Sequence, residues 1–221
     1  MADTHAQFFK KIKNSVAVVF DNHQLFADSF GKMLENLQLF RDVHTFSNET
    51  DLIHYLINFP YDTPGYFFLD YYLEEKTALP LVTDVKRMCR SSRVIIVSVV
   101  TGPVLIRNLA EHPRIDGIIS KYSGSPEVIE CIREVAGGRK YVAGYLRDIL
   151  AQNAGVEQMP FSDRELEILQ MASLGLTVDI TAGKLNISRH TVAAHRRKIL
   201  AKANCNSIAE LVVLARERKW I

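Results

Sequence analysis

One aspartate, Asp70, ends the apolar aromatic run in the stretch "YFFLDYYLEE". Other polar residues follow short apolar runs in the same way: Asp21 with Asn22, then Ser98, then Lys121. A carboxylate that meets a second acid, an amide, a hydroxyl and a lysine can help to hold a divalent cation and can accept a phosphoryl group. The lysine and the hydroxyl would then meet the new phosphoryl oxygens.

Five short runs of β-branched or aromatic residues are spaced along the first two thirds of the chain. They lie at residues 15–20, 43–46, 66–69, 93–98 and 117–120. The last three are almost wholly apolar, as buried parallel strands are. Segments with helical spacing of apolar residues separate the runs, and one of them, "SPEVIECIREV", has a Ser cap followed by Pro. Five βα units predict a doubly wound α/β fold with five parallel strands.

The candidate residues follow strands one, three, four and five of this predicted sheet. Ligands and chemistry gather at the carboxyl ends of the strands in doubly wound sheets. Taken singly, Asp70 fits a residue that starts a loop, Ser98 fits a strand end, and Lys121 fits a solvated cation. Because polar groups recur at four strand ends, the pattern favours one shared site over four unrelated positions.

The segments "VVFDNHQLF", "FFLDYYL", "VIIVS" and "GIISK" carry a family resemblance. Residues 14–140 resemble the receiver domain of bacterial two-component response regulators, in the family's order and spacing. The resemblance implies a flavodoxin-like fold, Asp70 as the phosphoacceptor, Ser98 as the switch hydroxyl and Lys121 as the phosphoryl partner. It implies a sensor histidine kinase as the partner, and Mg²⁺ bound by Asp21, the Asn22 side chain, Asp70 and the backbone carbonyl of Tyr72.

Several positions depart from the receiver pattern. Asn22 stands where the family has an acid; its amide oxygen still ligates a hard cation but contributes no charge, so weaker Mg²⁺ binding is expected. Val99 stands next to the expected phosphoryl group, where a very small residue is usual. The other departures are Glu74, Ala78, Ile118 and Tyr122. The alternative is therefore an atypical receiver that another ligand or a partner protein controls in place of phosphorylation.

The chain changes character after residue 140. Residues 141–158 lose the βα rhythm and include a short helical segment near 145–151, with a hinge at about 152–160. Residues 159–221 carry 10 Lys/Arg against 6 Asp/Glu, whereas residues 1–158 carry 17 against 19. The predicted organisation is a receiver domain at 1–140, a linker at 141–158 and a basic second domain at 159–221.

Four helices are predicted in the second domain, at residues 163–173, 178–185, 189–202 and 208–218. The segments "SDRE" and "SIAE" are capping boxes, with Ser at the cap and Glu three residues later. Only "NIS" separates the middle two helices, a turn short enough for a helix-turn-helix motif.

The third of these helices carries five basic residues and no acidic one. An ordinary solvated helix usually mixes signs, so this composition favours binding to a nucleic acid. At 100° per residue, His190, Ala193, Ala194 and Arg197 share one face. Two small alanines let the helix enter a major groove and let Arg197 reach guanine O6 and N7. His195 falls on the apolar side, which favours packing or a phosphate hydrogen bond.

Residues 159–221 resemble the LuxR/NarL-type helix-turn-helix almost without gaps. The resemblance makes residues 189–202 the recognition helix, and the last helix a homodimer contact. The implied contacts to double-stranded DNA come from Ser188, Arg189, His190, Thr191, Ala193, Ala194, Arg196, Arg197 and Lys198. Among these, Ala193, Ala194 and Arg197 would read bases, while Ser188, Thr191, Arg196 and Lys198 would lie near phosphates. Ala193 replaces an often basic residue and Thr181 a usual alanine, so a lower affinity or a changed preference is expected.

The combined prediction is a response regulator that acts as a dimeric transcription factor and has no enzyme activity beyond phosphorylation and dephosphorylation of Asp70. A phosphotransferring or phosphatase enzyme is disfavoured because Tyr72 stands where such an enzyme would have a second acid. A protein-binding regulator with a vestigial DNA helix is the other alternative.

Cellular context is also predicted from the sequence. The longest apolar runs are about five to six residues, against roughly 20 for a membrane span, and the first residues lack a signal core. Cys89, Cys131 and Cys205 suit neither a disulfide framework nor a zinc site. A cytoplasmic location without membrane contact is expected.

Overall fold

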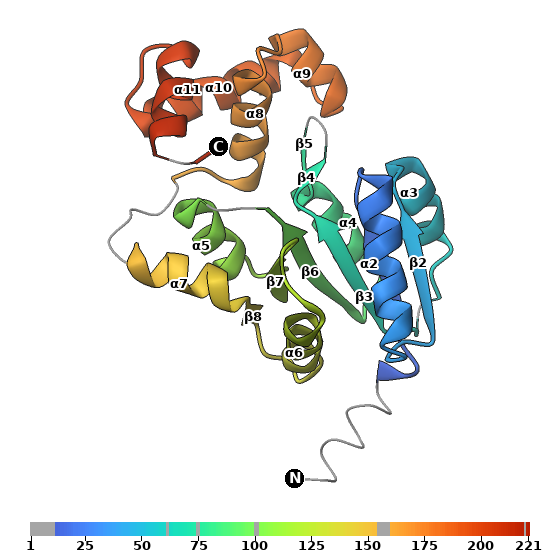
Figure 1. The fold of residues 1–221 in the computed structure, drawn as a ribbon. Helices are drawn as coiled ribbons and strands as arrows, with labels where there is room; N and C mark the ends of the chain where they lie inside the picture. The colour runs from blue at the N-terminus through green and yellow to red at the C-terminus, as the bar shows by residue number, and fades with distance from the viewer. Residues whose placement is uncertain (1–11, 61, 74–75, 100–101, 154–159, 219) are drawn as a thin grey trace.

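The computed structural model describes residues 12–221 except 61, 74–75, 100–101, 154–159 and 219, and shows an α/β domain followed by a helical domain (Figure 1). The central sheet is wholly parallel, in the order β2-β1-β3-β6-β7-β8. Its strands are β1 (Val16–Phe20), β2 (Asp42–Phe46), β3 (Gly65–Asp70), β6 (Ser92–Ser98), β7 (Gly117–Ser120) and β8 (Tyr141–Val142). The five predicted strands and the doubly wound fold are confirmed, and the short β8 is added.

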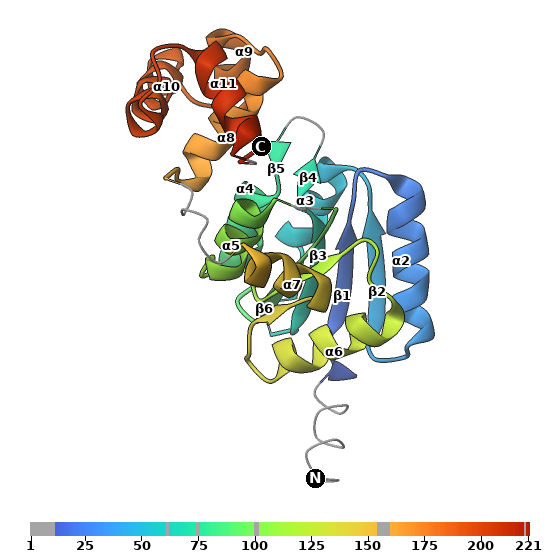
Figure 2. The ribbon, with the colours of Figure 1, turned by 60° about the vertical axis from the view of Figure 1, so that its left-hand side comes forward.

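Helices cover both faces of the sheet (Figures 1 and 2). They are α2 (Gln24–Asn36), α3 (Glu49–Ile57), α4 (Leu79–Met88), α5 (Pro103–Glu111), α6 (Ser125–Ala136) and α7 (Gly144–Gln152). Every residue of β3 is buried, as the apolar composition of this strand predicts. The sheet therefore forms the core of the domain and fixes the carboxyl ends of its strands.

Two further short strands, β4 (Tyr72–Leu73) and β5 (Lys76–Thr77), form an antiparallel hairpin directly after β3. The sequence analysis did not predict this hairpin. Glu74, one of the positions that depart from the receiver pattern, lies outside the described residues. The amide of Ala78 donates a hydrogen bond of 2.9 Å to the carbonyl of Tyr71, which closes the base of the hairpin. Strand β5 contacts helix α8 (Asp163–Ser173) of the helical domain.

The helical domain contains the four predicted helices, with ends within about one residue of the predicted limits. They are α8 (Asp163–Ser173), α9 (Val178–Lys184), α10 (Arg189–Ala203) and α11 (Ile208–Glu217). The capping box at Ser162 is present as predicted. At Ser207 half of the box forms: its side chain caps the amide of Glu210, but the Glu210 carboxylate accepts from Asn206 instead. Asn204 ends α10 in the left-handed conformation, with φ 54°.

The first part of the predicted linker packs on the α/β domain. Strand β8 pairs with β7, and α7 packs against α5. The side chain of Arg107 donates a hydrogen bond of 3.0 Å to the carbonyl of Asn153. Most of the predicted hinge lies outside the described residues, so the domain limits at 140 and 159 stay predictions.

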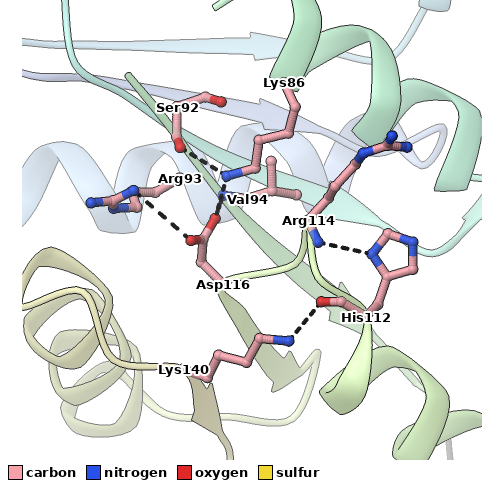
Figure 3. Close-up of polar contacts among 8 residues, drawn as sticks. All are labelled: Lys86, Ser92, Arg93, Val94, His112, Arg114, Asp116 and Lys140. Atoms are coloured by element: carbon pink, nitrogen blue, oxygen red, sulfur yellow. Dashed lines mark hydrogen bonds and ion pairs between the residues drawn. The ribbon is translucent and has the colours of Figure 1, made fainter. Parts of the chain in front are cut away.

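A polar cluster around Asp116 ties the amino ends of β6 and β7 to α4 (Figure 3). Asp116 accepts hydrogen bonds from the Lys86 ammonium at 2.6 Å and from the Val94 amide at 2.8 Å. The same ammonium donates to the carbonyl of Ser92 at 2.9 Å. This cluster fixes the register of β7, and hence the position of Lys121 at its other end.

Across the part of the chain that the structure describes, no helix combines the length and the apolar composition that a membrane crossing needs.

Candidate functional site

Three of the predicted site residues meet at the carboxyl ends of the central strands. Asp70 ends β3 and is 3% exposed, and Asp21 follows β1 and is 1% exposed. The ammonium of Lys121, directly after β7, lies 2.6 Å from Asp21 Oδ2 and 2.8 Å from Asp70 Oδ2. One cation is therefore shared by two buried carboxylates.

The charges at this site are strongly coupled. Burial raises the pKa of Asp70; Lys121 and the amide of Tyr72 act against this shift, Asp21 adds to it, and the net direction is upward. Burial alone would lower the pKa of Lys121, but hydrogen bonds to both carboxylates outweigh it and raise the pKa. The ring of Phe26 lies 4.7 Å from the ammonium and adds a cation–π contact. Lys121 is thus held in its charged form between the two acids.

Two buried oxygens at the site have no hydrogen-bond partner among the described residues, Ser98 Oγ and Asn22 Oδ1. Ser98 is 1% exposed, and its carbonyl accepts from the amide of Lys121 at 3.1 Å. A buried polar atom left unpaired costs about 1–3 kcal/mol. Two such atoms beside an acid–lysine cluster indicate that they serve a ligand.

His23 is a residue that the sequence analysis missed. Its amide donates to Asp21 Oδ1 at 2.9 Å, and its Nδ1 lies 3.2 Å from the same oxygen. Ligand atoms of Asp21, His23 and Asp70 all lie within 4.8 Å of one another. The sequence signal for this residue was its position in "DNHQLF", two residues after Asp21.

The donor set fits a hard divalent cation. Two carboxylates and the unpaired amide oxygen of Asn22 are oxygen ligands of the kind that Mg²⁺ takes. Lys121 already binds both carboxylates, so a metal ion must share them with the ammonium. Tyr72 begins β4, and the use of its carbonyl as a ligand stays a prediction.

The positions that depart from the receiver pattern fall into two groups. Val99 and Tyr122, each next to a site residue in sequence, are exposed, at 45% and 83%. Ala78 and Ile118 are buried in the core. The first two therefore stand where an approaching partner or phosphodonor would meet them, whereas the others act through packing.

Helix α10 presents the basic surface that the sequence predicts. Exposed residues at and after its start are Ser188, Arg189, His190, Arg197 and Lys198, and half-buried ones are Thr191, Ala193, Ala194 and Arg196. Val192 and Ile199 are buried behind them, and the side chain of Ser188 caps the helix. Arg189 lies 3.4 Å from Asp179, but both side chains are 68% exposed, so this pair contributes little stability.

Arg196 also has a role inside the helical domain. One of its Nη groups donates a hydrogen bond of 2.7 Å to the carbonyl of Leu176, in the turn between α8 and α9. Burial lowers the pKa of its guanidinium. Its predicted contact with a phosphate stays a prediction, since part of its hydrogen bonding is already used within the domain.

The fold and the two sites define a class of protein: a receiver-type α/β domain with an acid–lysine site, joined to a helix-turn-helix domain that has a basic recognition helix. Residues 159–215 match the model of the luxR family of bacterial regulatory proteins, and this segment belongs to that family. The chain therefore carries a LuxR-type DNA-binding domain after an α/β domain of the receiver type.

Curated relatives are similar to the chain over different lengths. The chain is 21% identical over 214 residues to the Fimbriae Z protein of Salmonella typhimurium, covering 95% of this chain and 100% of that protein. It is 35% identical over 109 residues to the response regulator UvrY of Escherichia coli, covering 45% of this chain and 48% of UvrY. The chain thus matches about half the length of UvrY.

A solved structure shares the fold over nearly the whole chain. It is RcsB from Salmonella enterica serovar Typhimurium, bound to the promoter P1flhDC in the presence of the phosphomimetic BeF3⁻. The TM-score is 0.70 at 20% identity, covering 94% of this chain and 100% of that chain. At this identity the likeness shows the fold.

Proposed function

We propose that the chain accepts a phosphoryl group on Asp70 from a sensor histidine kinase and, as a dimer, binds DNA to regulate transcription. The observation that carries this proposal is the ammonium of Lys121, bonded to both Asp21 and Asp70 at the carboxyl ends of three strands. A structural ion pair needs no third group, yet two unpaired buried oxygens lie beside this one. The cytoplasmic location expected from the sequence is part of the same proposal.

The residues of the site have separate roles in this reaction. An oxygen of Asp70 attacks the phosphorus, and the bond from phosphorus to the donor breaks. Asp21, Asn22, Asp70 and the carbonyl of Tyr72 would hold Mg²⁺, and when bound the ion would neutralise charge on the phosphoryl oxygens. Lys121 then donates to one phosphoryl oxygen and the Ser98 hydroxyl to another. The phosphoryl group carries a charge of about −1.5 to −2, which replaces the single charge of the Asp70 carboxylate at the base of the β4–β5 hairpin.

The second half of the proposal concerns helix α10. We place it in the major groove, with Ala193, Ala194 and Arg197 toward the bases and Lys198 toward a phosphate. Its exposed basic residues support this placement. On α11 the side chain of Val213 is 58% exposed, which supports a dimer contact through that helix.

An atypical receiver is the second candidate. One observation favours it: the ammonium of Lys121 lies 2.6 Å from Asp21 and 2.8 Å from Asp70, so it engages both carboxylates that a metal ion would need. Asn22 adds to this argument because it brings no charge to attract a cation. In this case another ligand or a partner protein would control DNA binding.

The deciding experiment measures incorporation of labelled phosphate from acetyl phosphate, with and without MgCl₂. The wild type and an Asp148→Asn control, changed at an exposed aspartate far along the chain, should take up label only with magnesium. Asp70→Asn should take up none. Label that persists in Asp70→Asn would show that another residue accepts the phosphoryl group. A wild type that takes up no label would favour the atypical receiver.

A further inference from the structure

Tyr71, the residue after Asp70, is 0% exposed although the chain turns out of the sheet there. Helix α8 of the helical domain lies against it: Asp163, Glu167 and Gln170 all act on its phenol. These three residues are spaced four and three apart, so they share one face of α8. Burial first, then the neighbouring Tyr72 and these two acids, raise the pKa of Tyr71 well above its usual value, while Gln170 acts against them. The phosphoacceptor's direct neighbour is therefore buried at the junction of the two domains.

The junction extends beyond Tyr71. A hollow of about 230 Å³ is lined by residues of both domains, of which Leu79, Leu105, Leu109, Phe161 and Leu166 are apolar and Asn108, Glu111, His112 and Asp163 are polar. At its rim His112 Nε2 lies 3.0 Å from Asp163 Oδ2. His112 Nδ1 accepts from the amide of Arg114 at 3.2 Å (Figure 3), so Nε2 carries the hydrogen that it donates to Asp163. Helix α8 is thus held at two points, by Tyr71 and by His112.

This junction leaves the predicted DNA-reading surface uncovered. Arg189, His190, Arg197 and Lys198 of α10 are exposed with both domains in place. The α/β domain therefore meets α8, and a signal from Asp70 cannot act by uncovering these four side chains.

The backbone links Asp70 to the Tyr71 contact directly. The Asp70 carboxylate accepts from the amide of Tyr72, and the carbonyl of Tyr71 accepts from Ala78. A phosphoryl group on Asp70 would change the hydrogen bonds of this side chain to the Lys121 ammonium and to the Tyr72 amide. The peptide groups on both sides of Tyr71 would then change position. In the described part, neither the Tyr71 hydroxyl nor Gln170 Oε1 has a hydrogen bond of good geometry. A buried polar atom without a partner carries a cost in free energy, so this contact adds little to the stability of the junction.

We propose that Tyr71 couples the state of Asp70 to the position of α8, and hence to the orientation of the DNA-binding domain, without changing access to α10. The inference rests on the proposed phosphorylation of Asp70. Tyr71 is here a positioning residue, and the partner surface is the face of α8 that carries Asp163, Glu167 and Gln170.

Trp220 provides a reporter for this contact. It is the single tryptophan of the chain, it is buried, and its ring packs at 5.1 Å against Phe161, which lines the hollow. The test uses the full chain, treated with acetyl phosphate and MgCl₂, as wild type, Tyr71→Phe and Gln170→Ala. Tyr145→Phe is the matched control, because Tyr145 lies on α7, away from Asp70, and is 56% exposed. Each sample is measured for incorporated phosphate and for the emission of Trp220.

The expected result separates the two readouts. All four proteins should take up label to within about twofold, and wild type and Tyr145→Phe should show the full emission change on labelling. Tyr71→Phe and Gln170→Ala should lose at least half of that change. A full change in both variants would overturn the role of Tyr71 and leave the proposed function standing. A wild type that takes up no label would overturn both the proposed function and the role of Tyr71, because Asp70 would then not be phosphorylated.

Discussion

At the scale of single residues, the charge balance around Lys121 decides what the site can bind. Two carboxylates face one ammonium, which leaves about one negative charge for a metal ion. Asn22 supplies an oxygen without a charge, and ligand charge is one of the main determinants of affinity for a hard cation. Binding of Mg²⁺ is therefore expected to be limited by residue 22.

Asn22→Asp should tighten Mg²⁺ binding and speed phosphorylation by acetyl phosphate, because it adds a charge beside the two acids. Calorimetric titration with MgCl₂ and the rate of label uptake measure the two effects. Asn36→Asp, at an exposed position on α2, is the control for added charge alone. If the two variants behave alike, the side chain at 22 does not ligate the ion.

The basic residues of α10 should differ in what they contribute to DNA binding. Arg197→Ala should cost about 1–3 kcal/mol on the preferred duplex and relax preference at one base pair. Lys198→Ala should weaken all duplexes alike and reduce the salt slope by about one unit. Titrations of selected and scrambled duplexes at several salt concentrations measure both. If Arg197→Ala lowers the affinity for the selected and the scrambled duplex equally, Arg197 contacts a phosphate and not a base.

At the scale of helices and strands, Glu165 links two elements of the helical domain. Its carboxylate accepts from the amide of Ser162 at 2.9 Å and from the ammonium of Lys202 at 2.5 Å. One acid thus closes the cap of α8 and fastens the end of α10 to it. Burial by itself would raise the pKa of Glu165, but these partners outweigh it and lower the pKa.

Glu165→Gln should lower the free energy of unfolding on the order of 1–3 kcal/mol, because it weakens hydrogen bonds to a charged group. Since the folded pKa is lowered, the stabilisation is present above the unfolded value of about 4.5 and is lost as pH falls through the folded pKa. Chemical unfolding at pH 7 and near pH 3 measures this. Glu210→Gln, the exposed counterpart at α11, should cost less. Equal costs at both pH values would contradict the role of the carboxylate.

Elements with a clear period were predictable from the sequence, and tertiary contacts were not. The buried run at 66–69 and the capped helix at Ser162 carry local signals, so both appear in the structure as predicted. Strands β4, β5 and β8 are two residues long and too short to show any period. The contact of Tyr71 with α8 joins residues about 100 positions apart, and no local pattern encodes it. The roles of the individual site residues stay predictions.

At the scale of the whole molecule, the acid–lysine site and the basic helix belong to different domains that meet through α8. Within the described residues, this junction is where a signal at Asp70 would pass toward α10, unless it acts through a change in assembly. A LuxR-type dimer should read two half-sites about one helical turn apart, so the orientation of each DNA-binding domain sets the fit to both. Control of orientation is therefore sufficient to control affinity.

The measurement that tests the central claim most directly is the affinity of the full chain for a selected duplex with two half-sites, before and after treatment with acetyl phosphate and MgCl₂. For the wild type we expect a gain of roughly 5- to 150-fold, the range of ordinary coupling energies. Asp70→Asn should bind as the untreated wild type does and gain nothing. An equal gain in both proteins, or no gain in a wild type that carries the label, would contradict control of DNA binding by Asp70.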